Sequence, residues 1–62
     1  MIATIEGIIT ERLKDSLVVN IGGVGLLVHV PASTVQDVES NQRIGLFTHL
    51  VVREDALTLF GF

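Results

Sequence analysis

Apolar and polar residues alternate with a period of two in five segments of this chain, and turn-forming residues separate the segments. The segments are residues 2–12, 17–21, 24–30, 43–53 and 56–62. Because successive side chains of an extended strand point to opposite faces, this period is typical of β-strands with one buried face. The sequence therefore predicts five strands, the first two of which pair as a hairpin across residues 13–16.

A glycine-rich motif, Gly22-Gly23-Val24-Gly25, lies between the second and third segments. Glycine-rich phosphate loops lead into the N-terminus of a helix, whereas a strand is expected after this motif. We therefore interpret Gly22 and Gly23 as a tight hairpin turn that needs positive φ, and Gly25 as a position that allows close approach of a neighbouring backbone.

The residues between the third and fourth segments predict a short helix. Ser33 or Thr34 can cap its N-terminus, with Gln36 in the capping-box position relative to Ser33. Val35 and Val38 lie three residues apart and share one side of such a helix. Five strands with a short helix between the third and fourth is the order of elements in an OB-fold, so we expect an all-β, five-stranded OB-fold barrel.

The small size of the chain limits how it can be stabilised. A domain of 62 residues buries only about 60% of the surface that its unfolded chain exposes. The chain has no cysteine for disulfides, yet 48% of its residues are hydrophobic and only 18% are charged. Several predicted strands carry apolar residues on both faces, so we expect a second subunit or further polypeptide to cover the surplus apolar surface.

The charge of the chain argues against strong binding of nucleic acid by this region alone. The net charge is −3, and the only cations are Arg12, Lys14, Arg43 and Arg53, which supply no basic patch for a phosphate backbone. No apolar run approaches the ~18 residues of a membrane span, and the first four residues lack the basic start of a signal peptide. These features predict a cytoplasmic, soluble chain.

The residues that could carry catalysis are not arranged for it. His29 and His49 lie on different predicted strands, without a second ligand at metal-binding spacing. Ser16, Ser33 and Ser40 fall in turn or cap positions rather than in the strand-to-helix turn that presents a nucleophilic serine. We expect no catalytic activity, no metal site and no cofactor.

The segment Arg53-Glu54-Asp55 places two adjacent acids at the tip of the hairpin between the fourth and fifth strands. A solvated turn is the simplest interpretation. Metal binding, a protein contact and electrostatic exclusion of phosphates are the alternatives that composition leaves open.

Three stretches of the chain together resemble the N-terminal domain of the RuvA family of bacterial Holliday-junction-binding proteins. They are Met1-Ile2 with Gly7, the Gly22-Gly23-Val24-Gly25 turn, and residues 48–56 leading to Leu59-Phe60-Gly61-Phe62. The resemblance covers all 62 residues, and its most specific parts are the Val-Val-Arg-Glu-Asp segment and the Leu-Phe-Gly-Phe ending.

The resemblance implies that residues 1–62 are an OB-fold first domain of a protein that acts in recombination and DNA repair. In this family a helix-hairpin-helix domain grips the DNA backbone, and a third domain contacts the RuvB motor ATPase, which hydrolyses ATP. The resemblance further implies a homotetramer on four-way junction DNA, with a RuvC-like resolvase as another partner.

By the same resemblance, Glu54 and Asp55 match an acidic pin at the centre of the DNA-binding face, and Arg53 is a candidate for pin support or a phosphate contact. Thr4 and Glu6 stand where familiar members carry basic residues, so DNA contacts through the first strand are not expected. The alternative from another class is a structural homo-oligomerisation module with no direct role on DNA.

Overall fold

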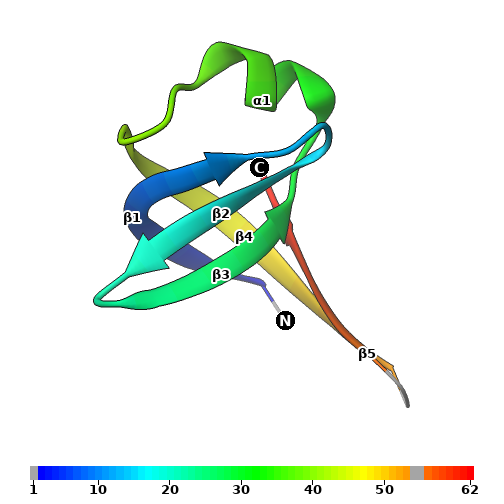
Figure 1. Cartoon of the computed structure of the whole chain (residues 1–62). Helices are drawn as coiled ribbons and strands as arrows, with labels where there is room; N and C mark the ends of the chain where they lie inside the picture. Colours follow the sequence, from blue (N-terminus) through cyan, green and yellow to red (C-terminus); the bar gives the residue numbers. More distant parts are fainter. Residues whose placement is uncertain (1, 54–55) are drawn as a thin grey trace.

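The computed structural model describes residues 2–53 and 56–62, and it is built from five strands and one short helix (Figure 1). The elements are β1 (Ile2–Arg12), β2 (Ser16–Ile21), β3 (Val24–His29), α1 (Ala32–Asp37), β4 (Arg43–Arg53) and β5 (Ala56–Gly61). The strands close into a barrel in the order β1-β2-β3-β5-β4. The predicted fold class, a five-stranded all-β barrel with a helix between the third and fourth strands, is confirmed.

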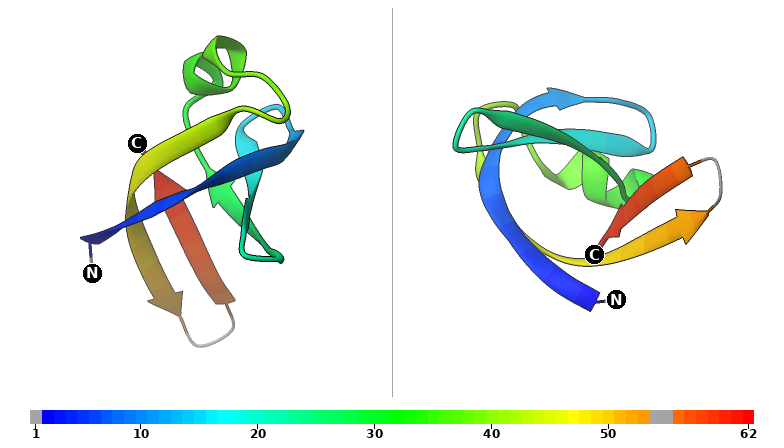
Figure 2. Two further views of the ribbon diagram at one scale, coloured as in Figure 1. Left: turned by 90° about the vertical axis from the view of Figure 1, so that its left-hand side faces the viewer. Right: turned by 90° about the horizontal axis from the view of Figure 1, so that it is seen from below.

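Strand β1 pairs with a different neighbouring strand along each of its two halves. Its first part pairs with β4 from Ile2 to Ile8, and its second part pairs with β2 from Ile8 to Arg12, with a bulge between Ile9 and Glu11. The strand therefore curves around the barrel, as the view from below shows (Figure 2). Gly7 is buried at this bend, where a side chain would press on the backbone of β2.

The core is formed by the faces that the alternation of the strands predicts. Ile9, Leu17, Val19 and Val28 are completely buried, and Leu46 of β4 joins them. Val35 of α1 and Val38, which directly follows the helix, are also buried, and α1 lies over one end of the barrel (Figure 1). One short helix therefore completes a core that the strands alone leave open.

The start of α1 differs from the sequence prediction. The helix begins at Ala32 with Pro31 as its N-cap, and no side chain caps it. The carbonyl oxygen of Pro31 accepts hydrogen bonds from the amides of Thr34 and Val35. Ser33 and Thr34 therefore lie inside the first turn and the predicted capping box is wrong, because the fixed φ of proline suits the residue at a helix start.

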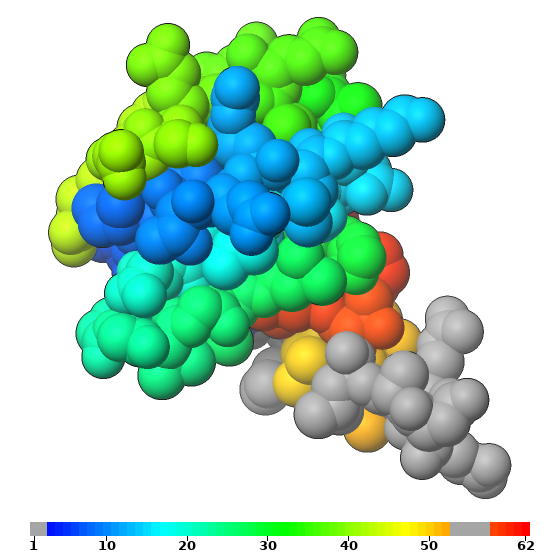
Figure 3. All heavy atoms as spheres, viewed as in Figure 1, coloured from blue at the N-terminus to red at the C-terminus, as the bar shows by residue number. Residues whose placement is uncertain are grey.

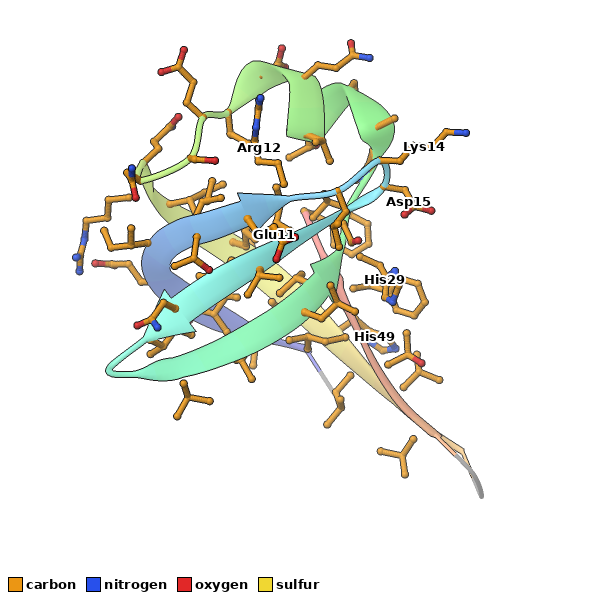
Figure 4. All side chains as sticks on the ribbon, viewed as in Figure 1. Glu11, Arg12, Lys14, Asp15, His29 and His49 are labelled. Atoms are coloured by element: carbon orange, nitrogen blue, oxygen red, sulfur yellow. The ribbon has the colours of Figure 1, made fainter. Side chains whose placement is uncertain are left out.

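Arg12 holds the other end of α1. The chain is in an extended conformation again at Val38, and the Arg12 guanidinium donates hydrogen bonds to the carbonyl oxygens of Val35 and Val38. Figure 4 shows Arg12 extending from β1 toward the helix. A cation near a helix C-terminus satisfies carbonyls that have no partner within the helix, so this side chain fastens α1 to the barrel.

Candidate functional site

Strands β4 and β5 continue together beyond the barrel as a two-stranded ribbon. Strand β1 pairs with β4 only up to the pair Ile2 and His49, and β3 pairs with β5 at His29 and Phe60. The β4–β5 ladder, by contrast, runs from Thr48 out to the pair Arg53 and Ala56. The described residues of the ribbon extend beyond the barrel in Figure 1, and Figure 3 shows the orange and red atoms of β5 beside the green atoms of β3.

The two acids singled out in the sequence, Glu54 and Asp55, lie in the sequence between the two strands of this ribbon. Arg53 pairs with Ala56 as the last pair of the ladder, so residues 54 and 55 are the connection between the strands, and two residues is the shortest common hairpin connection. Glu54 and Asp55 themselves lie outside the described residues, and so does the side chain of Arg53. The structure thus describes the strands that carry the acidic pair.

An exposed aromatic face lies at the base of the ribbon, and we call it the phenylalanine face. It is formed by residues of β4 and by C-terminal residues of the chain around a depression of about 540 Å³, namely Phe47, Thr48, His49, Val51, Phe60 and Phe62. All three phenylalanines of the chain are exposed here, Phe47 by 66%, Phe60 by 37% and Phe62 by 69%. Part of the apolar surplus expected from the sequence reaches solvent here.

Sequence reasoning missed this face. In the alternation of residues 43–53, Phe47, His49 and Val51 fall on one side of the fourth strand, and this signal for their shared direction is correct. It could not supply the register that puts Phe62 opposite Phe47, where the two residues exchange backbone hydrogen bonds of 3.1 and 2.8 Å.

The two histidines meet the same residue on this side of the barrel. Phe60 pairs with His29 of β3 and with His49 of β4, and the rings of His29 and Phe60 lie 5.8 Å apart between centroids. Both histidines lie on one side of the barrel in Figure 4. In the described part of the chain, no group of three or more His, Cys, Asp or Glu side chains could hold a metal ion.

The glycine motif forms the turn between β2 and β3. Gly22 and Gly23 have φ values of 60° and 96°, and the amide of Gly23 donates a 3.0 Å hydrogen bond to Oδ1 of Asn20. Positive φ at both central residues is typical of a type I′ hairpin turn. A Cβ atom on Gly25 would lie 3.3 Å from Cγ1 of Val18, so the side chains of β2 crowd this position.

Two of the three cations whose side chains the structure describes are bound to groups of the chain itself. Arg12 is held by α1, and Arg43 forms an exposed 2.7 Å ion pair with Glu6 across β4 and β1. A phosphate group would have to displace these partners.

Among the described elements, no helix is long and apolar enough to cross a membrane.

Residues 1–61 match the family model described as the RuvA N terminal domain. A relative from Chloroflexus aurantiacus is 52% identical over 63 residues, one from Salinispora arenicola is 47% identical over 62 residues, and one from an Escherichia coli O1:K1 strain is 43% identical over 63 residues. Each is named Holliday junction branch migration complex subunit RuvA.

All three alignments cover the whole of this chain but only 31–32% of the relative. The chain therefore spans about a third of the length of the curated relatives that it matches. Because the family model covers nearly every residue and the barrel has the predicted order of elements, the chain belongs to the RuvA N-terminal domain family.

Proposed function

We propose that residues 1–62 are the first domain of a RuvA-like branch-migration protein and act as a non-catalytic module that binds four-way junction DNA. The observation that carries this proposal is the match of residues 1–61 to the RuvA N-terminal domain. The projecting β4–β5 ribbon adds support, because it carries Glu54 and Asp55 in its connection.

The acids act in this proposal by repelling phosphates. One carboxylate and one phosphate at ~6 Å repel by roughly 0.7 kcal/mol at the dielectric constant of water, and by more where water is excluded. Glu54 and Asp55 from each of four chains give eight carboxylates around the axis of a tetramer. A continuous duplex across that centre brings phosphates close to them, whereas a junction has an open crossover there, so the acids favour branched DNA.

The attraction for DNA then has to come from outside this domain. The chain carries a net charge of −3, and Arg12 and Arg43 are bound to its own carbonyls and to Glu6. We assign backbone affinity to the helix-hairpin-helix domain of the longer protein and ATP hydrolysis to a RuvB-like partner. A RuvC-like resolvase completes the cytoplasmic complex in this proposal.

The proposal predicts that neutralising the acids weakens the preference for junctions. The substitutions Glu54→Gln and Asp55→Asn are made in a chimeric protein in which this chain replaces the matched region of the Chloroflexus aurantiacus relative. Losing two carboxylate–phosphate pairs at roughly 0.7 kcal/mol each removes roughly 1.4 kcal/mol of repulsion, which corresponds to about tenfold in affinity. Fluorescence anisotropy should show about tenfold tighter duplex binding with little change in four-way junction binding.

A matched control keeps the same change of net charge at another place. Asp37→Asn with Glu39→Gln removes two acids near the end of α1, where both residues are exposed. This double variant should leave the ratio of junction to duplex affinity unchanged. An identical ratio in both double variants would refute the exclusion role of Glu54 and Asp55.

The same repulsion predicts a dependence on salt. The Debye length falls from about 10 Å at 0.1 M salt to about 3 Å at 1 M, so added salt screens carboxylates from phosphates a few ångströms away. The difference in junction preference between the unsubstituted protein and the Glu54→Gln, Asp55→Asn variant should therefore shrink as salt rises. A difference that stays constant up to the highest salt that permits binding would point to a contact other than charge repulsion.

The alternative of an oligomerisation module without a role on DNA is not favoured. The relatives that match over the whole chain carry a name that refers to the Holliday junction, which supports the DNA role.

A further inference from the structure

The ribbon formed by residues 50–53 and 56–59 is attached to the barrel through very little structure. Beyond His49, the described pairing of β4 is with β5 alone, and beyond Phe60 toward the tip, β5 pairs with β4 alone. A two-stranded ribbon is only marginally stable by itself in water. Its direction is therefore decided where it leaves the barrel.

At that place the barrel closes through one row of residues. Phe60 stands between His29 of β3 and His49 of β4, and the pair His29 and Phe60 is the one register pair that joins β3 to β5. Paired residues of neighbouring strands share a face of the sheet. The rings of His29 and Phe60 meet there at 5.8 Å between centroids, with 42° between their planes.

The inner face of the same closure is held by Gly61. A Cβ atom at this position would lie 2.6 Å from Cγ1 of Val28 and 3.2 Å from Cδ1 of Leu46. The side chains of Val28 and Leu46 therefore pack against the backbone of Gly61 on the inside, while the rings of His29 and Phe60 lie against each other on the outside. A swing of the ribbon about this point has to separate the rings or press the backbone of Gly61 into the side chains of Val28 and Leu46.

We propose that His29 and Phe60 form a clasp that sets the direction in which the β4–β5 ribbon leaves the barrel. Both are positioning residues, since they act on the ribbon and touch no substrate. The consequence for DNA rests on the proposed function: by aiming the ribbon, the clasp aims the acidic connection toward the junction.

The absence of cysteine from the chain makes a direct test practical. Cysteines are introduced at Val24 and Val52, which are 59% and 67% exposed on β3 and on the ribbon, and both are spin-labelled. Electron–electron double resonance then measures the distribution of distances between the labels. We expect one narrow distribution in the otherwise unsubstituted chain.

Breaking the clasp should broaden this distribution. With Phe60→Leu or His29→Leu, which remove one ring but keep apolar bulk, the width should increase about twofold because the ribbon loses its support. Phe62→Leu is the matched control, as it makes the same change two residues away from Phe60. His29→Phe restores a ring opposite Phe60 and should therefore restore the narrow distribution. If His29→Leu acted only by destabilising the barrel, His29→Phe would not restore it.

The outcomes are distinct. Broadening with Phe60→Leu and His29→Leu, no broadening with Phe62→Leu, and rescue by His29→Phe support the clasp. An unchanged width in His29→Leu, or equal broadening in Phe62→Leu, overturns it. Circular dichroism identifies a variant that fails to fold, and the half-buried His29 provides a second variant if Phe60→Leu unfolds. Because no DNA is present, failure of the clasp is distinguishable from failure of the proposed junction preference.

Discussion

Gly7→Ala is expected to destabilise the domain more than any other alanine substitution of a glycine in this chain. A Cβ atom at Gly7 would collide with the backbone carbonyl oxygen of Asn20, and it would lie 2.9 Å from Cγ1 of both Ile21 and Val19. A backbone oxygen in a ladder cannot move aside as a flexible side chain can, so β2 has to shift from β1. We expect a loss of about 3 kcal/mol, at the upper end of the cost of overpacking a core.

This loss is large for a chain of this size. Native stability is roughly 0.05–0.15 kcal/mol per residue, which corresponds to about 3–9 kcal/mol for a domain of this length. The Gly7→Ala substitution should therefore remove between about a third and all of this stability, and at the lower limit about half of the molecules are unfolded at room temperature. Urea denaturation followed by circular dichroism measures the change in the free energy of unfolding.

Gly45→Ala serves as the matched control, since it makes the same substitution in a neighbouring strand. The nearest atom to a Cβ at Gly45 is the carbonyl oxygen of Ile5, at 3.9 Å, which is ordinary contact. This variant should differ from the unsubstituted chain by no more than about 0.5 kcal/mol, as expected for an unstrained surface position. Equal urea midpoints for Gly7→Ala and Gly45→Ala would contradict the close approach of β1 and β2.

Gly61→Ala is expected to have the second largest effect, because it acts on the closure between β3 and β5. The new Cβ would meet Cγ1 of Val28 at 2.6 Å, with Leu46 and Val30 at 3.2 Å. These neighbours are side-chain atoms in a packed core and can give way only in part, so we expect a loss of about 2 kcal/mol.

The position of this damage can be measured as well as its size. Hydrogen exchange should show the greatest loss of protection at the amides of Phe47 and Phe62, which bond to each other's carbonyl oxygens next to Gly61. The amides that join β1 to β2 should keep their relative protection. Uniform loss of protection over the whole barrel would mean that the substitution acts on global stability and not on the closure.

The sequence predicted the strands and their buried faces because a period of two directly reflects the geometry of a strand. The alternation puts Leu17 and Val19 on one face of the second strand and Val28 on one face of the third, and all three are fully buried. The predicted order of elements also held, since turn-forming residues separate the strands. Local pattern was sufficient for these features.

Features that depend on contacts between distant segments could not be predicted in this way. One example is the parallel pairing of His29 with Phe60, which are 31 residues apart in the sequence. Another is the pairing of Phe47 with Phe62, which are 15 residues apart. The predicted cap at Ser33 failed for a local reason, since Pro31 provides the start of α1. Glu54 and Asp55 lie outside the described residues, and their role stays a prediction.

The order of strands around the barrel has a consequence for how the domain forms. Strands β1, β2 and β3 are consecutive neighbours, so this meander can assemble from contacts that are close in the sequence, as fast-folding elements do. The circle is completed only by β5, the last strand of the described chain, which lies between β3 and β4. During synthesis on the ribosome, the meander therefore has to wait with its interior open to water until the final strand emerges.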